Sequence, residues 1–406
     1  MKILVISINF APDHSGIGVY STDFPLYLAE QGESVTMVTG FSYYPAWRKL
    51  PEDEGRLFAK EVYRGVRVLR GYLYVPQKVS TLTRLLHEAT FCFFAFLNCL
   101  RAGRQDLVVV FTPPFLLGLV GRVVAWMWRC PLVINVQDLP LDAAAALGMV
   151  KAGPFSRVLG WLERMIYRSA DDVVTISKGM RDILVSKGVA PTKCAIVPNW
   201  IKIGSWPEAS GGFFEDFPAS HGRFRVAYAG NLGIKQGVES LLKLAKRLEG
   251  DDRFWFFVFG DGADKARLLE IANELKLTNL SFAPLLDPAS YSRMLAEVDA
   301  VFVAQRSGAG NNFFPSKLLG LMAQAKPLLI SADPDSELSQ SVHKWQCGAV
   351  AAFDDTDGLA RNLLDLAANE SRLRLLGSNG VAAAKAFGRD EVLTAWHERI
   401  RRLTGT

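Results

Sequence analysis

The chain has 406 residues, half of them apolar, and its 46 basic and 41 acidic residues give a net charge of +5. This length exceeds the roughly 100–200 residues of one ordinary domain, so we expect a well-packed globular protein of two domains. The basic excess lacks the dense clusters of a dedicated nucleic-acid binder, so no nucleic-acid partner is predicted. It suits phosphate-bearing ligands or an anionic membrane surface.

The five cysteines are scattered and form no CxxC pair, which argues against a zinc or redox site and indicates a reduced, cytosolic setting. The opening MKILVIS lacks a secretory signal pattern. Two apolar stretches, Phe91–Leu97 and the one that begins at Leu116, are shorter than the roughly 20 residues that span a bilayer. They predict either core helices or helices with one face in a membrane surface, and the sequence leaves both readings open.

Strand-like runs alternate with helix-length segments through residues 1–203. The runs are KILVISIN, SVTMVT, LVVVF, PLVINV, DVVTIS and CAIVP, and the helical segments include Val19–Gln31 and Arg157–Arg168. This alternation predicts parallel strand pairing in a Rossmann-like acceptor domain. Residues 204–222 are rich in Gly, Ser, Pro and aromatic residues without a period, which predicts a linker.

The alternation restarts over residues 223–388 with FRVAYAG, RFWFFVFG, LSFAP, AVFVA, PLLIS and GAVAAF. The predicted fold class is therefore α/β, with two Rossmann-like domains that face each other across a cleft, and the second is expected to bind the nucleotide. Ligand loops would follow the strands on both walls. Residues 389–406 predict a final helix, with apolar spacing from Val392 to Ile400, that could cross back to the first domain.

A candidate diphosphate site follows the run AVFVA. Pro315 suits the first turn of a helix, Ser316 and Lys317 come next, and Arg306 lies on the loop before it. A helix N-terminus with a hydroxyl and two basic side chains suits a diphosphate. The alternative is a capped surface helix with a solvated lysine.

Two glycine-containing turns between a strand and a helix are further candidates. Glycines there allow a ligand to approach the backbone closely, and the helix N-terminus offers N–H groups to an anion or a sugar oxygen. Either turn could equally be an ordinary connection. The residues concerned are Gly16 and Gly18 in the first turn, and Gly230, Asn231, Lys235 and Gln236 in the second.

Asp138 ends the run VINVQD, where a carboxylate could orient an acceptor hydroxyl or act as a base. It could equally cap the segment that follows. The histidines are isolated in sequence and no DxD triplet occurs, so no metal is expected.

Several of these motifs together resemble the retaining glycosyltransferases of GT-B fold, family 4. The resemblance rests on SGIG, LERMIYRSADDVVTIS, IVPNW, GNLGIKQG and the PSK helix that ends in AKPLLI. More narrowly, YYPAW at 43–47, YVPQKVSTLTRLLHEATF at 74–91 and VAQRSGAG resemble the colanic-acid fucosyltransferases. The likeness covers nearly the whole chain.

The resemblance implies a hexosyltransferase that needs no metal and lies peripherally on the cytoplasmic face of the inner membrane. It would move a sugar from a nucleotide-sugar donor, with GDP-fucose favoured, to a lipid-linked exopolysaccharide intermediate such as colanic acid. Lys317, Arg306 and the loop from Asn231 to Gln236 would hold the diphosphate. Gly16 and the Asp138 loop would face the donor sugar and the acceptor. Anomeric retention would need no covalent protein nucleophile, because a diphosphate oxygen would assist deprotonation.

The chain also departs from the family pattern. Asn312 and Gly320 stand where many members carry two glutamates, one of which binds the ribose, and Glu337 could substitute for it. Asn231 and Gln236 replace the commoner basic pair of the diphosphate loop. Two alternatives follow: a GT-B-type UDP-sugar epimerase, and a non-catalytic scaffold of a polysaccharide assembly complex.

Overall fold

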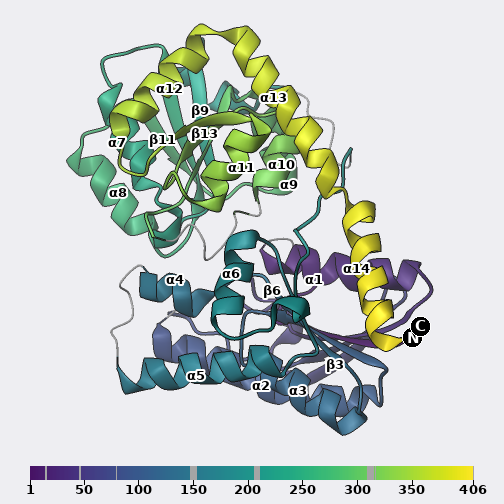
Figure 1. Cartoon of the computed structure of the whole chain (residues 1–406). Helices are drawn as coiled ribbons and strands as arrows, with labels where there is room; N and C mark the ends of the chain where they lie inside the picture. Colours follow the sequence, from purple (N-terminus) through teal and green to yellow (C-terminus); the bar gives the residue numbers. More distant parts are fainter. Residues whose placement is uncertain are drawn as a thin grey trace. The chain divides into compact units, whose positions relative to one another are not determined.

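The computed structural model describes residues 1–13, 16–44, 47–78, 80–146, 153–204, 211–308, 315 and 317–405. The chain divides into two compact units (Figure 1). The described residues of 1–145, 150–200 and 390–406 form unit 1, and those of 146–149 and 201–389 form unit 2.

Unit 1 is built on one sheet, with the strand order β3-β4-β2-β1-β5-β6-β7-β8. Neighbouring strands are parallel, except that β3 and β4 are antiparallel. Every residue of β5 and β6 is buried, as expected for parallel strands that helices cover on both faces. The bounds are β1 Lys2–Ile6, β2 Ser34–Gly40, β3 Phe58–Tyr63, β4 Val66–Gly71, β5 Leu107–Thr112, β6 Leu132–Val136, β7 Asp172–Thr175 and β8 Cys194–Ile196.

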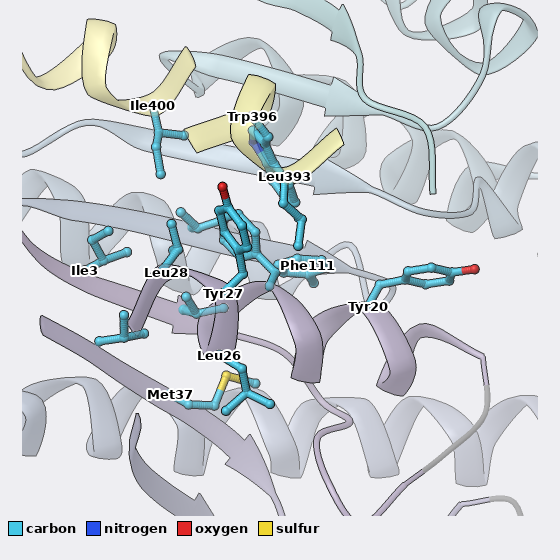
Figure 2. Close-up of a cluster of buried hydrophobic side chains, with 14 of the residues drawn as sticks. Ile3, Tyr20, Leu26, Tyr27, Leu28, Met37, Phe111, Leu393, Trp396 and Ile400 are labelled. Atoms are coloured by element: carbon cyan, nitrogen blue, oxygen red, sulfur yellow. The ribbon is translucent and has the colours of Figure 1, made fainter. Parts of the chain in front are cut away.

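The described helices of unit 1 are α1 Ile17–Glu30, α2 Thr81–Ala102, α3 Leu117–Trp128, α4 Pro140–Ala146, α5 Pro154–Ser169, α6 Lys178–Ser186 and α14 Arg389–Thr404. Figure 2 shows α14 contributing Leu393, Trp396 and Ile400 to the core of this unit. The indole of Trp396 stacks on Phe24 of α1, with ring centroids 3.9 Å apart. The last helix of the chain is thus part of the unit with which the chain begins.

Helices α2 and α3 cover the other face of this sheet. A Cβ added at Gly121 of α3 would lie 2.4 Å from Val110, whose neighbours Val109 and Phe111 belong to the core beneath α1 and α14. Since successive strand residues point to opposite faces, α3 lies opposite α1. Phe91 of α2 is fully buried, and Phe94 packs edge-on against Phe58. The face of α2 that carries Phe91 and Phe94 therefore belongs to the hydrophobic core. For this face the structure agrees with the first of the two predictions, a core helix.

Unit 2 is a fully parallel sheet in the order β11-β10-β9-β12-β13-β14. Its strands are β9 Phe224–Asn231, β10 Phe254–Asp261, β11 Leu280–Ala283, β12 Ala300–Ala304, β13 Leu328–Ser331 and β14 Gly348–Ala351. Its described helices are α7 Glu239–Arg247, α8 Lys265–Glu274, α9 Pro288–Glu297, α10 Lys317–Ala323, α11 Glu337–Trp345, α12 Thr356–Ala368 and α13 Glu370–Ala384. The predicted fold class, two α/β domains of Rossmann type, is confirmed by the architecture of the two units.

The segment 204–222 differs from the predicted linker. Phe213 and Phe214 begin a short 3-10 helix and are buried in the core of unit 2. The rings of Phe214 and Phe257 of β10 lie with centroids 4.7 Å apart. The aromatic residues that break the sequence period are thus hydrophobic anchors, and residues 211–222 are an integral part of unit 2.

Among the described residues, no helix is both long and apolar enough to cross a membrane.

Candidate functional site

The strand order of each sheet reverses at one point, and the candidate residues follow the strands at these points. In unit 2 the reversal falls between β9 and β12, and in unit 1 between β1 and β5. Loops that leave neighbouring parallel strands in opposite directions open a crevice at their carboxyl ends, where ligands of open α/β sheets bind. Each unit is therefore considered separately, from its own loops.

Lys317 lies beside the Gly230 turn in unit 2. Its Nζ is 3.5 Å from the centre of the Tyr228 ring and donates a hydrogen bond of 3.4 Å to the carbonyl of Ala229. A Cβ added at Gly230, where φ is 141°, would lie 3.9 Å from this Nζ. The fold thus brings Lys317 to the end of β9, next to Ala229, which lies 88 residues earlier in the sequence.

Burial lowers the pKa of Lys317 to about 7. The ammonium contacts the Tyr228 ring and the Ala229 carbonyl. It forms no ion pair with a carboxylate of the described residues. Removing a charge from water without an opposite charge disfavours the protonated form. An incoming phosphate would supply the missing negative charge, so this site is electrostatically prepared for an anion.

The turn after β9 needs a glycine at Gly237, where φ is 61° and an added Cβ would lie 2.5 Å from the Phe353 ring. At Gly233 an added Cβ would lie 2.6 Å from the Gln236 Oε1, the movable end of a side chain. Asn231 is exposed at the end of β9, and Lys235 and Gln236 form a 3-10 turn after it. The Gln236 Oε1 is buried and has no hydrogen-bond partner among the described residues. The polar side chains predicted for this loop therefore lie on a tightly constrained backbone.

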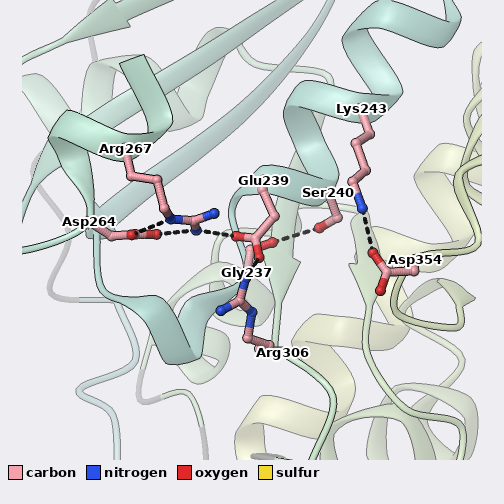
Figure 3. A network of polar contacts seen from close by, with 8 residues as sticks. All are labelled: Gly237, Glu239, Ser240, Lys243, Asp264, Arg267, Arg306 and Asp354. Atoms are coloured by element: carbon pink, nitrogen blue, oxygen red, sulfur yellow. Dashed lines mark hydrogen bonds and ion pairs between the residues drawn. The ribbon is translucent and has the colours of Figure 1, made fainter. Parts of the chain in front are cut away.

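Arg306, which was predicted to bind the diphosphate, already forms an ion pair within unit 2. Its backbone N–H donates to the carbonyl of Lys235 at 3.0 Å, which ties the loop after β12 to the loop after β9. Its guanidinium binds the carboxylate of Glu239 in the first turn of α7 (Figure 3). The role of Arg306 as a diphosphate ligand stays a prediction, and its guanidinium charge is partly balanced by the Glu239 carboxylate.

Glu239 is a residue of this site that the sequence reasoning missed. It is buried, and it also accepts a hydrogen bond of 3.0 Å from Arg267 of α8, which in turn binds Asp264 at 2.6 Å (Figure 3). An acidic residue just after a glycine-rich turn is usual at a helix N-terminus, so the pattern GVES gave little signal. The network fixes α7, α8 and the loop after β12 to one another.

The remaining predicted residues of unit 2 are only partly placed. Glu337 is the first residue of α11, after the Ser336 cap. Gly320, where the resemblance would place a ribose-binding glutamate, lies within α10. Ser316 and Asn312 lie outside the described residues.

In unit 1, Gly16 and Gly18 open helix α1. Gly16 has a φ of 58° and is the residue before the helix begins. A Cβ at Gly18 would lie 3.0 Å from the Asp13 carbonyl oxygen. Asp13 is buried and accepts a hydrogen bond of 2.8 Å from Asn9, and another from Ser42. The sequence did not indicate this buried carboxylate beside the glycine turn, because its partner Ser42 lies far away in sequence, in the loop after β2.

Asp138 lies half-buried between the end of β6 and helix α4. Because β6 is two strands from β1 in a parallel arrangement, the Asp138 loop and the Gly16 turn emerge at the same edge of the sheet. The segment that follows Asp138 is anchored by Lys187, whose Nζ lies 2.5 Å from the Asp142 carboxylate and also binds the buried Glu163. The loop is thus held in place from α5 and α6.

Two of the three motifs that carry the narrower resemblance touch each other. Tyr43 and His87 lie with ring centroids 4.6 Å apart, and Trp47 lies 5.4 Å from the same imidazole. The His87 Nδ1 makes a hydrogen bond of 2.6 Å with the Tyr74 carbonyl, and burial lowers the pKa of His87. A neutral imidazole therefore joins these motifs close to the loops at the carboxyl edge of the sheet.

Within the described ranges, no three His, Cys, Asp or Glu side chains form a group that could hold a metal ion. The expectation of a metal-independent enzyme stays a prediction.

Two Rossmann-like units with glycine-containing loops at their reversal points match the GT-B architecture, and comparison with known proteins gives the family. Residues 15–200 match the family model described as "Glycosyl transferase 4-like domain", and residues 213–382 match "Glycosyl transferases group 1". WcaI of Escherichia coli (strain K12), named as a glycosyl transferase of colanic acid biosynthesis, is 32% identical over 351 residues. That alignment spans 84% of this chain and 85% of WcaI.

Two solved structures share the fold over essentially their whole length. Sucrose-phosphate synthase from Thermosynechococcus elongatus superposes with a TM-score of 0.77 at 17% identity, covering 100% of this chain and 99% of that one. Anabaena HepE, solved with UDP and glucose, gives 0.72 at 14% identity, covering 99% and 100%. The chain belongs to the glycosyltransferase family that combines these 4-like and group 1 domains, and it is a hexosyltransferase.

Proposed function

We propose that this hexosyltransferase moves fucose from GDP-fucose onto a lipid-linked exopolysaccharide intermediate such as colanic acid. The name of WcaI supports the polysaccharide class, and the motifs shared with fucosyltransferases support the sugar. The HepE complex with UDP and glucose makes UDP-sugars the principal alternative donors. The enzyme would work without a metal, peripherally on the cytoplasmic face of the inner membrane.

The single observation that carries the proposal is the Lys317 ammonium at the Gly230 turn. Its distance of 3.5 Å from the Tyr228 ring and its lowered pKa describe a cation held without a counter-charge. A nucleoside diphosphate that leaves a sugar gains negative charge in the transition state, and a preorganised cation stabilises that charge. Lys317 would therefore act on the leaving group.

The other residues receive supporting roles. The backbone from Gly230 to Gln236 would approach the diphosphate closely, and Arg306, oriented by Glu239, would add a second cation. In unit 1 the Gly16 turn would face the donor sugar, and Asp138 would orient the acceptor hydroxyl. With retention of configuration, a diphosphate oxygen would take the acceptor proton.

The test is a transfer assay with purified protein, a lipid-linked acceptor and a panel of GDP- and UDP-sugars. We expect transfer from one donor class, and a loss of about 10²-fold in kcat for Lys317→Met, because one preorganised charge is removed. Lys243→Met is the matched control, since Lys243 of α7 forms an exposed ion pair with Asp354, and its replacement should leave the rate unchanged.

Absence of transfer from every donor, in an assay where a known glycosyltransferase works, would contradict the proposal. Conversion of a UDP-sugar without acceptor would indicate epimerisation instead. A thermal-shift comparison of GDP, UDP and dTDP identifies the donor base, because a ligand at about 100 times its Kd stabilises by about 2.7 kcal/mol.

A further inference from the structure

Helices α2, α3 and α5 pack side by side on one face of the sheet of unit 1, and α3 contacts both of its neighbours (Figure 1). Their inner sides form the core, as Phe91 shows. Their outer sides are also apolar, which the core does not explain. A soluble globular surface rarely exposes contiguous apolar area over several elements, unless a partner covers it.

The outer side of α3 carries an apolar stripe. Leu119, Val123, Trp126 and Met127 are all exposed, and they follow the spacing of one helix face. The Trp126 side chain is 70% exposed, a large value for the residue type that gains most from burial. This stripe has the spacing of a helix face that a partner covers.

The neighbouring helices continue the stripe. On α5, Val158, Trp161 and Met165 repeat at three- and four-residue intervals, and Trp161 is 58% exposed. On α2, Leu82 and Phe93 are 76% and 59% exposed. We call the outward sides of these three helices the α2–α3–α5 surface.

The exposed charges on this surface are mainly basic, and the one acidic residue of α2, Glu88, pairs with Arg84. Arg157, Arg164 and Arg168 are exposed on α5, while the acid of the same helix, Glu163, is buried against Lys187. Helix α3 contains no acidic residue. Long arginine side chains can lay their apolar stems along such a surface while the guanidinium groups reach anionic headgroups.

An open cavity of about 860 Å³ lies at the end of α3, lined in part by Arg122, Arg129 and Trp126. The Arg122 guanidinium forms an ion pair of 3.5 Å with the Asp171 carboxylate. Arg129 is exposed at the turn that ends the helix. Guanidinium groups beside an exposed indole combine a phosphate contact with an interfacial aromatic anchor.

We infer that the α2–α3–α5 surface docks unit 1 onto an anionic phospholipid membrane. Interfacial binding requires an apolar face with tryptophan and a basic margin, and both are present on three adjacent helices. The excess of exposed arginines at this margin favours an anionic lipid surface over an uncharged partner surface. The inference rests on the proposed function only in that a lipid-linked acceptor brings the enzyme to a membrane.

The test compares binding of the full chain to vesicles of phosphatidylcholine alone and to vesicles with added phosphatidylglycerol. We expect binding to the anionic vesicles, weakened by high salt because exposed charges are screened. The double variant Trp126→Glu, Trp161→Glu should lower vesicle partitioning by about tenfold or more. The control variant Val62→Glu, Leu375→Glu changes equally exposed apolar residues elsewhere and should bind as the wild type does.

Thermal unfolding and the GDP and UDP shifts of each variant establish that it is folded. Equal vesicle binding by the Trp126 and Trp161 variant and the wild type would overturn the inference, as would wild-type protein that ignores anionic vesicles. A wild-type dimer that the same variant converts to monomer would assign the surface to a second copy. Vesicle binding without transfer from any donor would instead defeat only the proposed function.

Discussion

The proposed contact between Lys317 and the diphosphate predicts that nucleotide binding depends on pH in a defined direction. Burial lowers the pKa of Lys317 in its free form to about 7, and a bound diphosphate favours the protonated form. Below pH 7 the lysine is already charged, and above it each binding event must take up a proton. The Kd for GDP or UDP should therefore rise with pH above about 7, approaching tenfold per unit.

The measurement is calorimetric titration in buffers of different ionisation enthalpy, which reports the protons taken up. The terminal phosphate also titrates, with a second pKa of about 6, so the wild type is compared with Lys317→Met. The variant should bind more weakly and lose the uptake that the wild type shows between pH 7 and 8. Equal proton uptake by both proteins would mean that Lys317 does not meet the phosphate.

At the scale of single residues, the sequence could indicate Lys317 but not Glu239. A basic residue just after Pro315 and before an apolar helix is a local pattern, so the lysine stands out without any knowledge of the fold. The role of Glu239 depends on Arg267 and Arg306, which are 28 and 67 residues away. Such a pairing is visible only after the strands have been placed in order.

At the scale of elements, Glu239 joins α7, α8 and the loop after β12, so its loss should cost more than that of a surface pair. Glu239→Gln leaves two partly buried arginines without their shared carboxylate, and we expect a loss of about 2 kcal/mol. Asp354→Asn removes the exposed partner of Lys243 on the same helix and should cost less than about 0.5 kcal/mol. Urea unfolding of both variants measures the difference.

Comparable small losses in the two variants would show that the network is screened like an ordinary surface pair. A large loss for Glu239→Gln with unchanged nucleotide binding would make the network purely structural. A combined loss would support its role in orienting Arg306 for the diphosphate.

For helices and strands, the sequence predicted some elements well and others poorly. The β-branched runs identified the buried parallel strands, because such strands are apolar on both faces. The apolar pattern of α2 could not say which side faces the sheet, since Phe91 and Phe93 are equally hydrophobic and differ only in burial. The aromatic residues near Phe213 looked irregular because a short 3-10 helix has no long period to display.

For the whole molecule, the alternation of strands and helices was sufficient to predict two Rossmann-like domains, because parallel pairing and crossover rules leave few other folds. The strand orders that locate the two candidate sites were beyond the sequence. They follow from which hydrophobic faces pack together across long separations, and one such contact joins the two ends of the chain.

Replacing Trp396 tests how much the packing of α14 on α1 stabilises unit 1. Trp396 is fully buried in unit 1, stacked on Phe24, and α14 is further held by Arg399, which binds Asp172 at 2.8 Å. Trp396→Ala should destabilise unit 1 by about 3–5 kcal/mol, because a large core cavity is left. Trp161→Ala, which removes an exposed indole from the same unit, should cost about 0.5 kcal/mol or less.

Hydrogen exchange followed by mass spectrometry locates the effect of Trp396→Ala. Amides of β1 and β5 should lose protection, since they form the sheet beneath α14, whereas those of β9 and β12 should keep theirs. A GDP or UDP thermal shift that survives in the variant would agree with a diphosphate site built entirely from unit 2. Equal loss of protection in both sheets would mean that the units unfold as one, and that α14 stabilises the whole chain rather than the unit it packs on.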